Sequence, residues 1–374
     1  MLQHRHGPYE RGMSDDVNAS VAAALQDLSA VQPSTHRERA FARAARAIFS
    51  LDRPLTDLRD THGALPRIAA VGPSSLRVIL EVLDTGRSET VERAIADRGA
   101  GAEVDRRRRL RDRFLSRAAV IAALRVGRRG ALAPGNYRAD LQMHSTWSDG
   151  GEPIAELAAA AIARGCTHLA ITDHSHGLPI ARGMTTEAAA AQHREIDRLN
   201  DVLAGAFRVI KGVEANLLGD GTLDLSADER RRFELVLAAP HSQLRTAEDQ
   251  TARLRAAVAA PAVAVLAHPR GRKYGARAGI NADWDRVFAA AAAAGVAVEI
   301  DGDPYRQDLD FELARRALAA GCLFALDSDA HASSELVYAE TAIAHARLAG
   351  IPADRVLNCW PLDRLLDWLA TRRA

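Results

Sequence analysis

From residue 138 to residue 327, short apolar runs alternate with alanine-rich segments of helical character. Most of these segments are about ten to eighteen residues long, as crossover helices between parallel strands require. Seven such units in about 235 residues fit a closed, slightly distorted (β/α)7 barrel better than an open sheet, which the pattern alone does not exclude. The apolar runs are residues 138–143, 167–172, 207–213, 235–240, 262–267, 296–301 and 322–327.

The first third of the chain has a different pattern. Residues 17–125 contain only helical patterns, which predict a small all-α domain and a basic linker helix over 16–135, before an α/β barrel over 136–374. A chain of 374 residues is long enough for these two domains. Residues 1–15 are polar, and we expect a disordered tail there.

Composition excludes several classes of protein. Lys and Arg together number 49 against 48 Asp and Glu, so overall charge favours neither a nucleic-acid binder nor an acidic protein. Cys166, Cys322 and Cys359 are far apart and form no CxxC pair, which argues against a disulfide framework or a thiolate zinc site. No apolar run approaches the roughly 18 residues of a membrane span, and nothing resembles a signal peptide, so we expect a cytoplasmic protein.

Polar clusters follow all seven runs at the end where a parallel barrel gathers its reactive side chains. A lone histidine is usually a packing residue, and His168, His176, His193 and His345 are expected to be of that kind. Imidazoles and carboxylates that recur at one rim suggest Zn²⁺, Mn²⁺ or Fe²⁺ instead, and eight of them exceed what one ion can use. The eight are His144, Asp149, His174, Glu214, His241, His268, Asp329 and His331.

The stretch "DLQMHSTWSDGG" places Asp140, Gln142 and His144 at alternate positions. Alternate side chains of a strand point the same way, so these three converge on one face. An unpaired polar group buried there would cost roughly 2 to 7 kcal/mol. Three polar residues on one face of a buried strand therefore need a specific reason to be there.

Several of these segments resemble the motifs of the PHP (polymerase and histidinol phosphatase) family, and most of all the PHP domain of bacterial family X DNA polymerases. The resemblance covers residues 138–374 and includes "DLQMHSTWSDG", "AITDHS", "KGVEAN", "PHS", "AHPRGR", "DSDAH" and "NCWPLDRLLDWL". It implies a distorted (β/α)7 barrel whose rim holds up to three metal ions.

The resemblance also implies how the ligands are shared. Gln142, His144, Glu214 and Asp329 would bind a first ion, and Glu214 would bridge to a second ion held by His241 and His268. A third ion would lie between Asp149, His174 and His331. This sequence departs from the family pattern at Gln142, where most members have the first histidine of an HxH motif. An uncharged amide oxygen in place of imidazole would make the first site weaker, labile or tuned toward Mn²⁺. Asp140 is expected to support these ligands.

The implied chemistry is phosphate-ester hydrolysis by a metal-bound hydroxide, with Glu214, His174 and Asp329 as catalytic residues. The loop "HPRGRKYGARAG" offers Arg270, Arg272 and Lys273 to bind a substrate phosphate, as well as Arg277. A solvated basic loop is the alternative. Glu299, Asp301 and Asp303 could contact substrate, support ligands or cap a loop, and Asp173 could orient a ligand or cap a turn.

Residues 64–88 resemble the helix-hairpin-helix of family X polymerases, although only Gly72 of the expected glycine pair is present. About 45 residues separate this segment from the barrel, too few for a polymerase palm. A basic run could bind a DNA backbone, or form a solvated, salt-bridged helix face. It comprises Arg106 to Arg109, Arg111, Arg113, Arg117, Arg128 and Arg129.

We therefore expect a metal-dependent phosphoesterase with two or three divalent ions, acting as a 3′ to 5′ exonuclease or phosphodiesterase on DNA ends. One alternative is a phosphomonoesterase of a small metabolite, similar to histidinol phosphatase. Another is a non-catalytic DNA-binding module with the barrel as scaffold. DNA is a possible partner through the helical region, and no membrane partner is expected.

Overall fold

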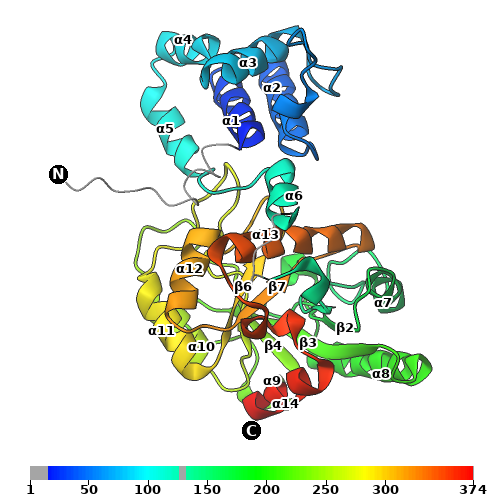
Figure 1. Ribbon diagram of the computed structural model, residues 1–374. Helices are drawn as coiled ribbons and strands as arrows, with labels where there is room; N and C mark the ends of the chain where they lie inside the picture. Colours follow the sequence, from blue (N-terminus) through cyan, green and yellow to red (C-terminus); the bar gives the residue numbers. More distant parts are fainter. Residues whose placement is uncertain (1–15, 126–131, 374) are drawn as a thin grey trace, which may run out of the picture. The chain divides into compact units, whose positions relative to one another are not determined.

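The structure is a computed structural model that describes residues 16–125 and 132–373. The chain folds as two compact units (Figure 1). One is the helical region up to residue 125 together with Tyr274–Ala276, and the other is the α/β region that forms the rest of the chain. The tail expected over 1–15, Arg128 and Arg129 lie outside the described residues.

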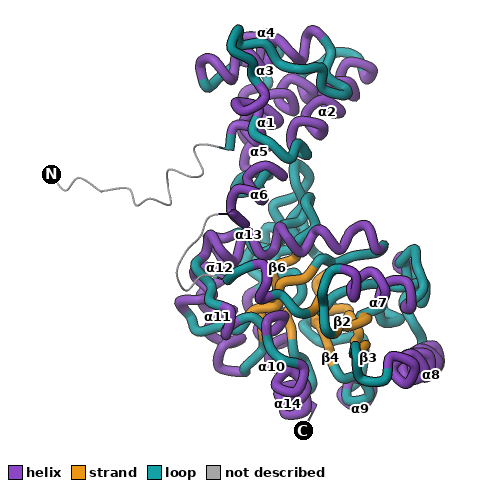
Figure 2. Tube along the Cα trace, turned by 45° about the vertical axis from the view of Figure 1, so that its right-hand side comes forward, coloured by secondary structure: helices purple, strands orange, loops and turns teal. Residues whose placement is uncertain are grey.

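The α/β unit is built on one seven-stranded parallel sheet whose strands follow chain order from β1 to β7. In Figure 2 these strands lie at the centre of the unit, with helices around them. Each strand falls within or overlaps one of the seven predicted runs, and the distorted barrel is confirmed. The strands are β1 (Ala139–Asp140), β2 (His168–Ile171), β3 (Arg208–Leu217), β4 (Leu235–Pro240), β5 (Val265–Leu266), β6 (Ala297–Asp301) and β7 (Phe324–Asp327).

Helices follow the strands as the alternation predicts. The α-helices are α7 (Ile154–Ala163), α8 (Thr186–Leu203), α9 (Ala227–Arg230), α10 (Thr251–Ala259), α11 (Trp284–Ala294), α12 (Phe311–Ala319), α13 (Ala339–Ala349) and α14 (Leu362–Arg373). The 3₁₀ helices are η2 (Pro134–Asn136), η3 (Pro179–Ala181), η4 (Ser333–Tyr338), η5 (Ala353–Arg355) and η6 (Leu357–Cys359).

Between β1 and β7 the barrel is closed mainly by hydrogen bonds of side chains, rather than by a regular series of backbone hydrogen bonds between the two strands. An isolated bridge joins Met143 to Ala330, whose carbonyl accepts from the His144 N–H at 2.8 Å. Below it, the buried Asn358 donates to Oδ1 of Asp327 at 2.7 Å and to the Ala139 carbonyl at 3.0 Å. The C-terminal segment therefore joins the two outer strands and holds the ends of β1 and β7 together.

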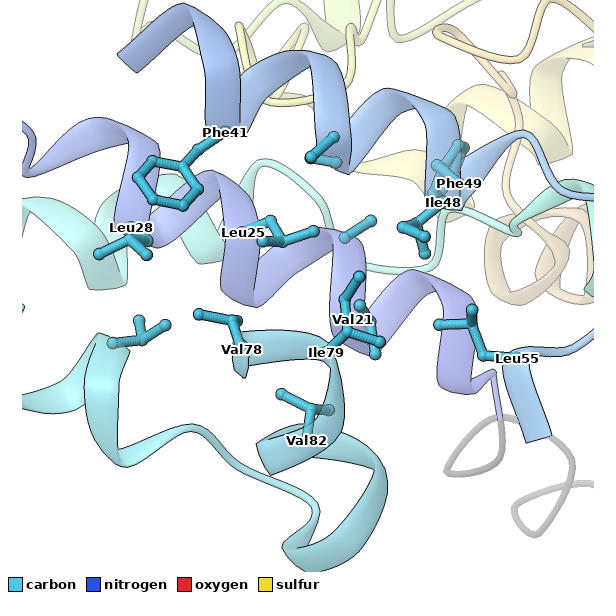
Figure 3. Close-up of a cluster of buried hydrophobic side chains, with 14 of the residues drawn as sticks. Val21, Leu25, Leu28, Phe41, Ile48, Phe49, Leu55, Val78, Ile79 and Val82 are labelled. Atoms are coloured by element: carbon cyan, nitrogen blue, oxygen red, sulfur yellow. The ribbon is translucent and has the colours of Figure 1, made fainter. Parts of the chain in front are cut away.

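The helical unit packs around one apolar core. Figure 3 shows Leu25, Phe41 and Ile79 among the side chains that fill it. Tyr274 belongs to this core, where its ring lies 4.9 Å from that of Phe49. The helices are α1 (Val17–Ala30), α2 (Thr35–Phe49), η1 (Leu55–Leu58), α3 (Pro73–Thr85), α4 (Glu89–Asp97), α5 (Gly101–Arg109) and α6 (Arg117–Arg125).

The helix-hairpin-helix expected over residues 64–88 stays a prediction. Residues 59–72 make turns rather than a first helix, and Pro66 in this segment has no N–H to donate. The second helix is α3, which begins after Gly72. Ala70 has φ +61°, the left-handed conformation that glycine tolerates and alanine disfavours. Ala70 therefore has a backbone conformation that a glycine would adopt at lower cost.

The basic run of α5 is largely paired with acids. Arg106 and Arg107 bind Glu103 within the same helix, and Arg108 and Arg111 bind the buried Asp27. This pairing fits a salt-bridged helix face and uses much of the charge that a DNA backbone would require.

The described helices include none with the length and apolar character needed to cross a membrane.

Replacing Ala70 by glycine should stabilise the helical unit. Glycine adopts the left-handed conformation without strain, which stabilises the folded chain, but it also adds entropy to the unfolded chain. The net effect should raise the free energy of unfolding by about 0.5 to 1 kcal/mol. Ala42→Gly, on the exposed face of α2, is the matched control and should lower it by about 1 kcal/mol. Urea unfolding followed by circular dichroism measures both, and a destabilised Ala70→Gly would contradict the turn described.

Candidate metal centre

The predicted ligands meet at the carboxyl ends of the strands. Glu214 lies within β3, and the others stand on the segments that follow β1, β2, β4, β5 and β7. Because parallel strands end at one rim, residues up to 187 positions apart come into contact, as Gln142 and Asp329 do. The nine predicted ligands are Gln142, His144, Asp149, His174, Glu214, His241, His268, Asp329 and His331.

Glu214 is at the centre of the site, with a side chain that is 1% exposed. Its Oε1 lies 2.7 Å from Nε2 of His268 and 3.1 Å from Nε2 of His241. Its Oε2 lies 3.3 Å from Nε2 of His144 and 3.3 Å from Nδ1 of His174. Burial raises the pKa of Glu214, but the neighbouring histidines outweigh burial and hold it well below its usual range. One ionised carboxylate is thus shared by imidazoles from four loops.

Around this carboxylate, three groups of side chains are compact enough to hold metal ions. In each group, one ligand atom per residue lies within 4.8 Å of the others. The groups are His144 with Glu214 and Asp329; His174 with Glu214 and His241; and His144 with Asp149, His174 and His331. The second group contains His174 where the resemblance implies His268, and His144 and His174 each belong to two groups. The sharing of ligands among ions stays a prediction.

Two of these residues have an unfavourable backbone conformation. His268 has φ +58° and Asp329 has φ +52°, in the left-handed region that costs a non-glycine residue about 1 to 2 kcal/mol. Such conformations persist where the surrounding structure fixes a side chain for a purpose. Here they direct an imidazole and a carboxylate into the same cluster.

Gln142 lies between Glu299 and Asp329 with its side chain fully buried. The orientation that suits its neighbours has the amide N–H2 donating to Oε2 of Glu299 at 3.0 Å. The amide oxygen then lies 3.3 Å from Oδ1 of Asp329. In the other orientation the amide N–H2 donates to Oδ1 of Asp329 at the same 3.3 Å, so a role of Gln142 as a metal ligand stays a prediction.

Asp140 and Asp173 support the rim through other residues. Oδ1 of Asp140 accepts from the backbone N–H of Ser328 at 3.2 Å, next to Asp329, rather than from a ligand side chain. Asp173 accepts from the N–H of Ser145 at 2.8 Å and from Gln192 at 2.6 Å. Asp173 therefore holds the turn after β1, which is neither of the two roles expected from the sequence.

Beneath the ligands lies a group of fully buried acids, Glu299, Asp301 and Asp327. Burial raises the pKa of Glu299 well above its usual value, and the charges of Asp327 and Asp301 raise it further. Burial also raises the pKa of Asp327 to about 6. This excess of acid makes the floor of the site favourable for cations.

The arginines expected to bind substrate contact the protein instead. Arg272 is buried, and its Nε donates to the carbonyls of Arg306 and Gln307, both at 3.0 Å. Arg270 binds the buried carboxylate of Asp310 at 2.9 Å. Substrate binding by these two arginines is a prediction that the geometry disfavours, because their guanidinium groups are engaged in the fold. Lys273 is exposed, and its role stays a prediction.

Sequence reasoning missed Arg306, on the loop after β6. Its Nη1 lies 3.3 Å from Oδ2 of Asp329 and 3.7 Å from Oδ2 of Asp301. Burial lowers the pKa of Arg306, but the charges of Asp329, Asp301 and Asp303 raise it above its usual value. The only available signal was an arginine beside "EIDGDP", which carries no spacing pattern.

His345 is a packing histidine, as expected, and lies behind the same loop. Its Nδ1 accepts from the Phe311 N–H at 3.1 Å, and its Nε2 lies 2.8 Å from Oε1 of Gln307. These contacts require the neutral ring with its proton on Nε2. Burial lowers the pKa of His345 to about 3.

Comparison with known proteins finds similarity over part of the barrel. The PHP domain family matches residues 140–260. The "DNA polymerase/3′-5′ exonuclease PolX" of Bacillus subtilis is 39% identical over 225 residues, which are 60% of this chain and 39% of that protein. The chain therefore spans about two fifths of the length of this relative.

Two further proteins are similar over the barrel. A "Probable phosphatase" of Syntrophotalea carbinolica is 28% identical over 248 residues, which are 62% of this chain and 95% of that protein. The crystal structure of histidinol phosphate phosphatase from Lactococcus lactis, complexed with zinc, L-histidinol and phosphate, is 17% identical, with a TM-score of 0.42. That match covers 56% of this chain and 94% of the other.

The buried His345 should make stability depend on pH. The unfolded chain takes up its proton near pH 6.5 and the folded chain near pH 3, so the stability that neutral His345 contributes falls as pH drops through this window. The difference in unfolding free energy between wild type and His345→Gln should narrow by about 2 kcal/mol from pH 7 to pH 5. Ala70→Gly titrates nothing and should show a constant difference. A constant difference for His345→Gln would contradict the neutral buried ring.

Proposed function

We propose that this chain, whose barrel is similar in part to the PHP domain family, is a metal-dependent phosphoesterase that hydrolyses phosphate esters. The observation that carries the proposal is the buried Glu214 carboxylate, which lies within 3.3 Å of imidazole nitrogens of His144, His174, His241 and His268. Imidazoles converge on an ionised carboxylate in this way where they bind cations in common.

The donor set fits divalent transition metals. Imidazole and carboxylate ligands suit Zn²⁺, Mn²⁺ or Fe²⁺, and the site contains no thiolate. Gln142, His144, Glu214 and Asp329 are proposed to hold one ion, with Glu214 shared by a second between His241 and His268. Asp149, His174 and His331 are proposed to hold a third. Two or three ions would also compensate the buried acids beneath.

Bound there, divalent ions would lower the pKa of water, orient a phosphate and neutralise charge on its oxygens. The chain's own residues fix this arrangement. Glu214, His174 and Asp329 are largely shielded from solvent, whereas Asp149 and His331 are about one third exposed. Nε2 of His331 lies 3.5 Å from Oδ1 of Asp149. Burial lowers the pKa of His331, but the neighbouring Asp149 outweighs burial and raises it above its usual value.

For the substrate we favour a phosphodiester at a DNA end, cleaved by a 3′ to 5′ exonuclease. The support is the similarity to the Bacillus relative, whose name includes a 3′-5′ exonuclease, and the helical unit that precedes the barrel. The salt-bridged α5 weakens the case for that unit's basic run. DNA would then bind through other surfaces of the chain.

A second candidate is a phosphomonoesterase acting on a small molecule. It is favoured by the match to the probable phosphatase, of which this chain spans 95% of the length. The barrel alone would suffice for such an activity. A non-catalytic DNA-binding module is a third reading, and it predicts that removing metal leaves function unchanged.

Removal of metal or of the shared carboxylate should abolish hydrolysis. Protein loaded with Mn²⁺ or Zn²⁺ should hydrolyse p-nitrophenyl phosphate, its bis ester or a 3′-recessed duplex, and chelation should remove that activity. Glu214→Gln and His174→Ala should lower kcat by at least about 100-fold and lower the metal content, because each removes a proposed ligand. His36→Ala, an exposed histidine of α2, is the control. Full activity in both site variants would sink the assignment.

The relative rates on these substrates separate the two candidates. An exonuclease should cleave the duplex and the bis ester much faster than the monoester, and its duplex binding should weaken steeply as salt rises. A phosphomonoesterase should instead hydrolyse the monoester much faster than the bis ester and the duplex, and should not bind the duplex even at low salt.

Gln142→His should tighten the first metal site. Imidazole is a better ligand than an amide oxygen for a borderline metal, so the Zn²⁺ content after dialysis should rise toward that of a site with a full HxH pair. The converse variant His144→Gln should lose ions under the same dialysis. Equal Zn²⁺ retention by wild type and Gln142→His would show that residue 142 is no ligand.

A further inference from the structure

Arg306 reaches the candidate metal centre from outside the ligand set. Its side chain is 27% exposed, whereas those of Asp329 and Asp301, which it faces, are 4% and 0% exposed. The guanidinium therefore stands where the buried cluster opens to solvent. A molecule that enters the site would meet Arg306 before it met the carboxylates.

Arg306 and His144 contact different oxygens of the Asp329 carboxylate. Nε2 of His144 lies 3.0 Å from Oδ1, whereas Nη1 of Arg306 lies 3.3 Å from Oδ2. The guanidinium thus leaves Oδ1, which faces the other candidate ligands, unobstructed. Arg306 is a neighbour of the metal centre rather than a competitor for it.

The guanidinium of Arg306 forms ion pairs, but no hydrogen bonds, with the residues that the structure describes. Its guanidinium forms ion pairs of 3.3 to 3.8 Å with Asp329, Asp301 and Asp303, but donates no hydrogen bond to any residue that the structure describes. A guanidinium carries five N–H donors, and a largely buried one normally spends them. An oxyanion at the mouth would satisfy them in the forked geometry that arginine offers to phosphate.

Other cations lie on the same sector of the rim. Arg277 is on the loop after β5, and Arg245 is on the segment after β4. Burial lowers the pKa of Arg277, and the nearby charges of Arg306 and Arg245 lower it further. Like charges brought together in this way favour the binding of an anion.

The loop that carries Arg306 is braced from below by Arg272. The buried Arg272 donates from Nε to the carbonyl of Arg306 itself, and its Nη1 lies 3.3 Å from Oδ2 of Asp310. Asp310 is fully buried and caps α12 by accepting from the N–H groups of Glu312 and Leu313. The backbone at Arg306 is therefore tied to a helix end through one guanidinium.

We propose that Arg306 binds the phosphate group of the substrate beside the candidate metal ligands, and that Arg272 is the residue that positions it. The inference rests on the proposed phosphoesterase function and assigns its phosphate-binding residue. The other role open to Arg306 is to neutralise Asp301 and Asp329 without touching substrate. The two roles differ in what happens to phosphate affinity when Arg306 is changed and the metals are retained.

Binding of inorganic phosphate, measured by isothermal titration calorimetry on the full chain beside the metal content of the same samples, tests the proposal. Arg306→Gln should weaken phosphate binding roughly 10- to 100-fold with the metal content unchanged, since charge-assisted hydrogen bonds are lost. Arg306→Lys should recover only part of the affinity. Arg316→Gln, which removes a surface arginine of α12 paired with Asp285, is the matched control.

Phosphate affinity within twofold of wild type in Arg306→Gln overturns the inference and leaves the proposed function intact. A wild-type protein that binds no metal and hydrolyses no phosphate ester would contradict the proposed function. If its phosphate binding were nevertheless weakened by Arg306→Gln, that result would still support the inference. Arg272→Lys should keep its fold and bind phosphate about tenfold more weakly at temperatures well below its melting point. A lower melting point with unchanged phosphate affinity would make Arg272 merely structural.

Discussion

The structure depends on one buried carboxylate that is held among imidazoles from four loops. Glu214 lies within 3.3 Å of His144, His174, His241 and His268 and is almost fully shielded from water. Burying a charge in an apolar interior is unfavourable unless cations or hydrogen bonds compensate it. The parallel barrel provides for this by ending its strands at one rim, where separate loops deliver compensating groups. The rim of this barrel is thus organised around a single charge.

The charge balance extends below and beside this carboxylate. Glu299, Asp301 and Asp327 form an excess of fully buried acid beneath the ligands, and burial, followed by the charges of Asp327 and Asp301, raises the pKa of Glu299 well above its usual value. Arg306 compensates part of this excess from the mouth through Asp301 and Asp329. Such a site favours divalent cations at its floor and an anion at its entrance, which is the polarity that phosphate-ester hydrolysis needs.

The sequence predicted the barrel and the meeting of its rim residues because both follow from local patterns. Strand runs and crossover lengths can be counted along the chain, and Glu214 or His268 stands at the end of such a run. The contacts of Arg306 and Asn358 could not be predicted, since each depends on a loop path set by packing across the fold. The turn at Ala70 shows the same limit, because no sequence pattern indicates that an alanine adopts the left-handed conformation there.

The central claim is that the histidines around Glu214 bind cations in common. Anomalous diffraction from crystals grown with Zn²⁺ or Mn²⁺ tests it most directly. The account predicts peaks about 2.0 to 2.3 Å from Oε1 and Oε2 of Glu214 and from imidazole nitrogens of His144 and His268. Crystals without a peak within about 3 Å of Glu214, at metal concentrations that saturate zinc enzymes, would contradict it.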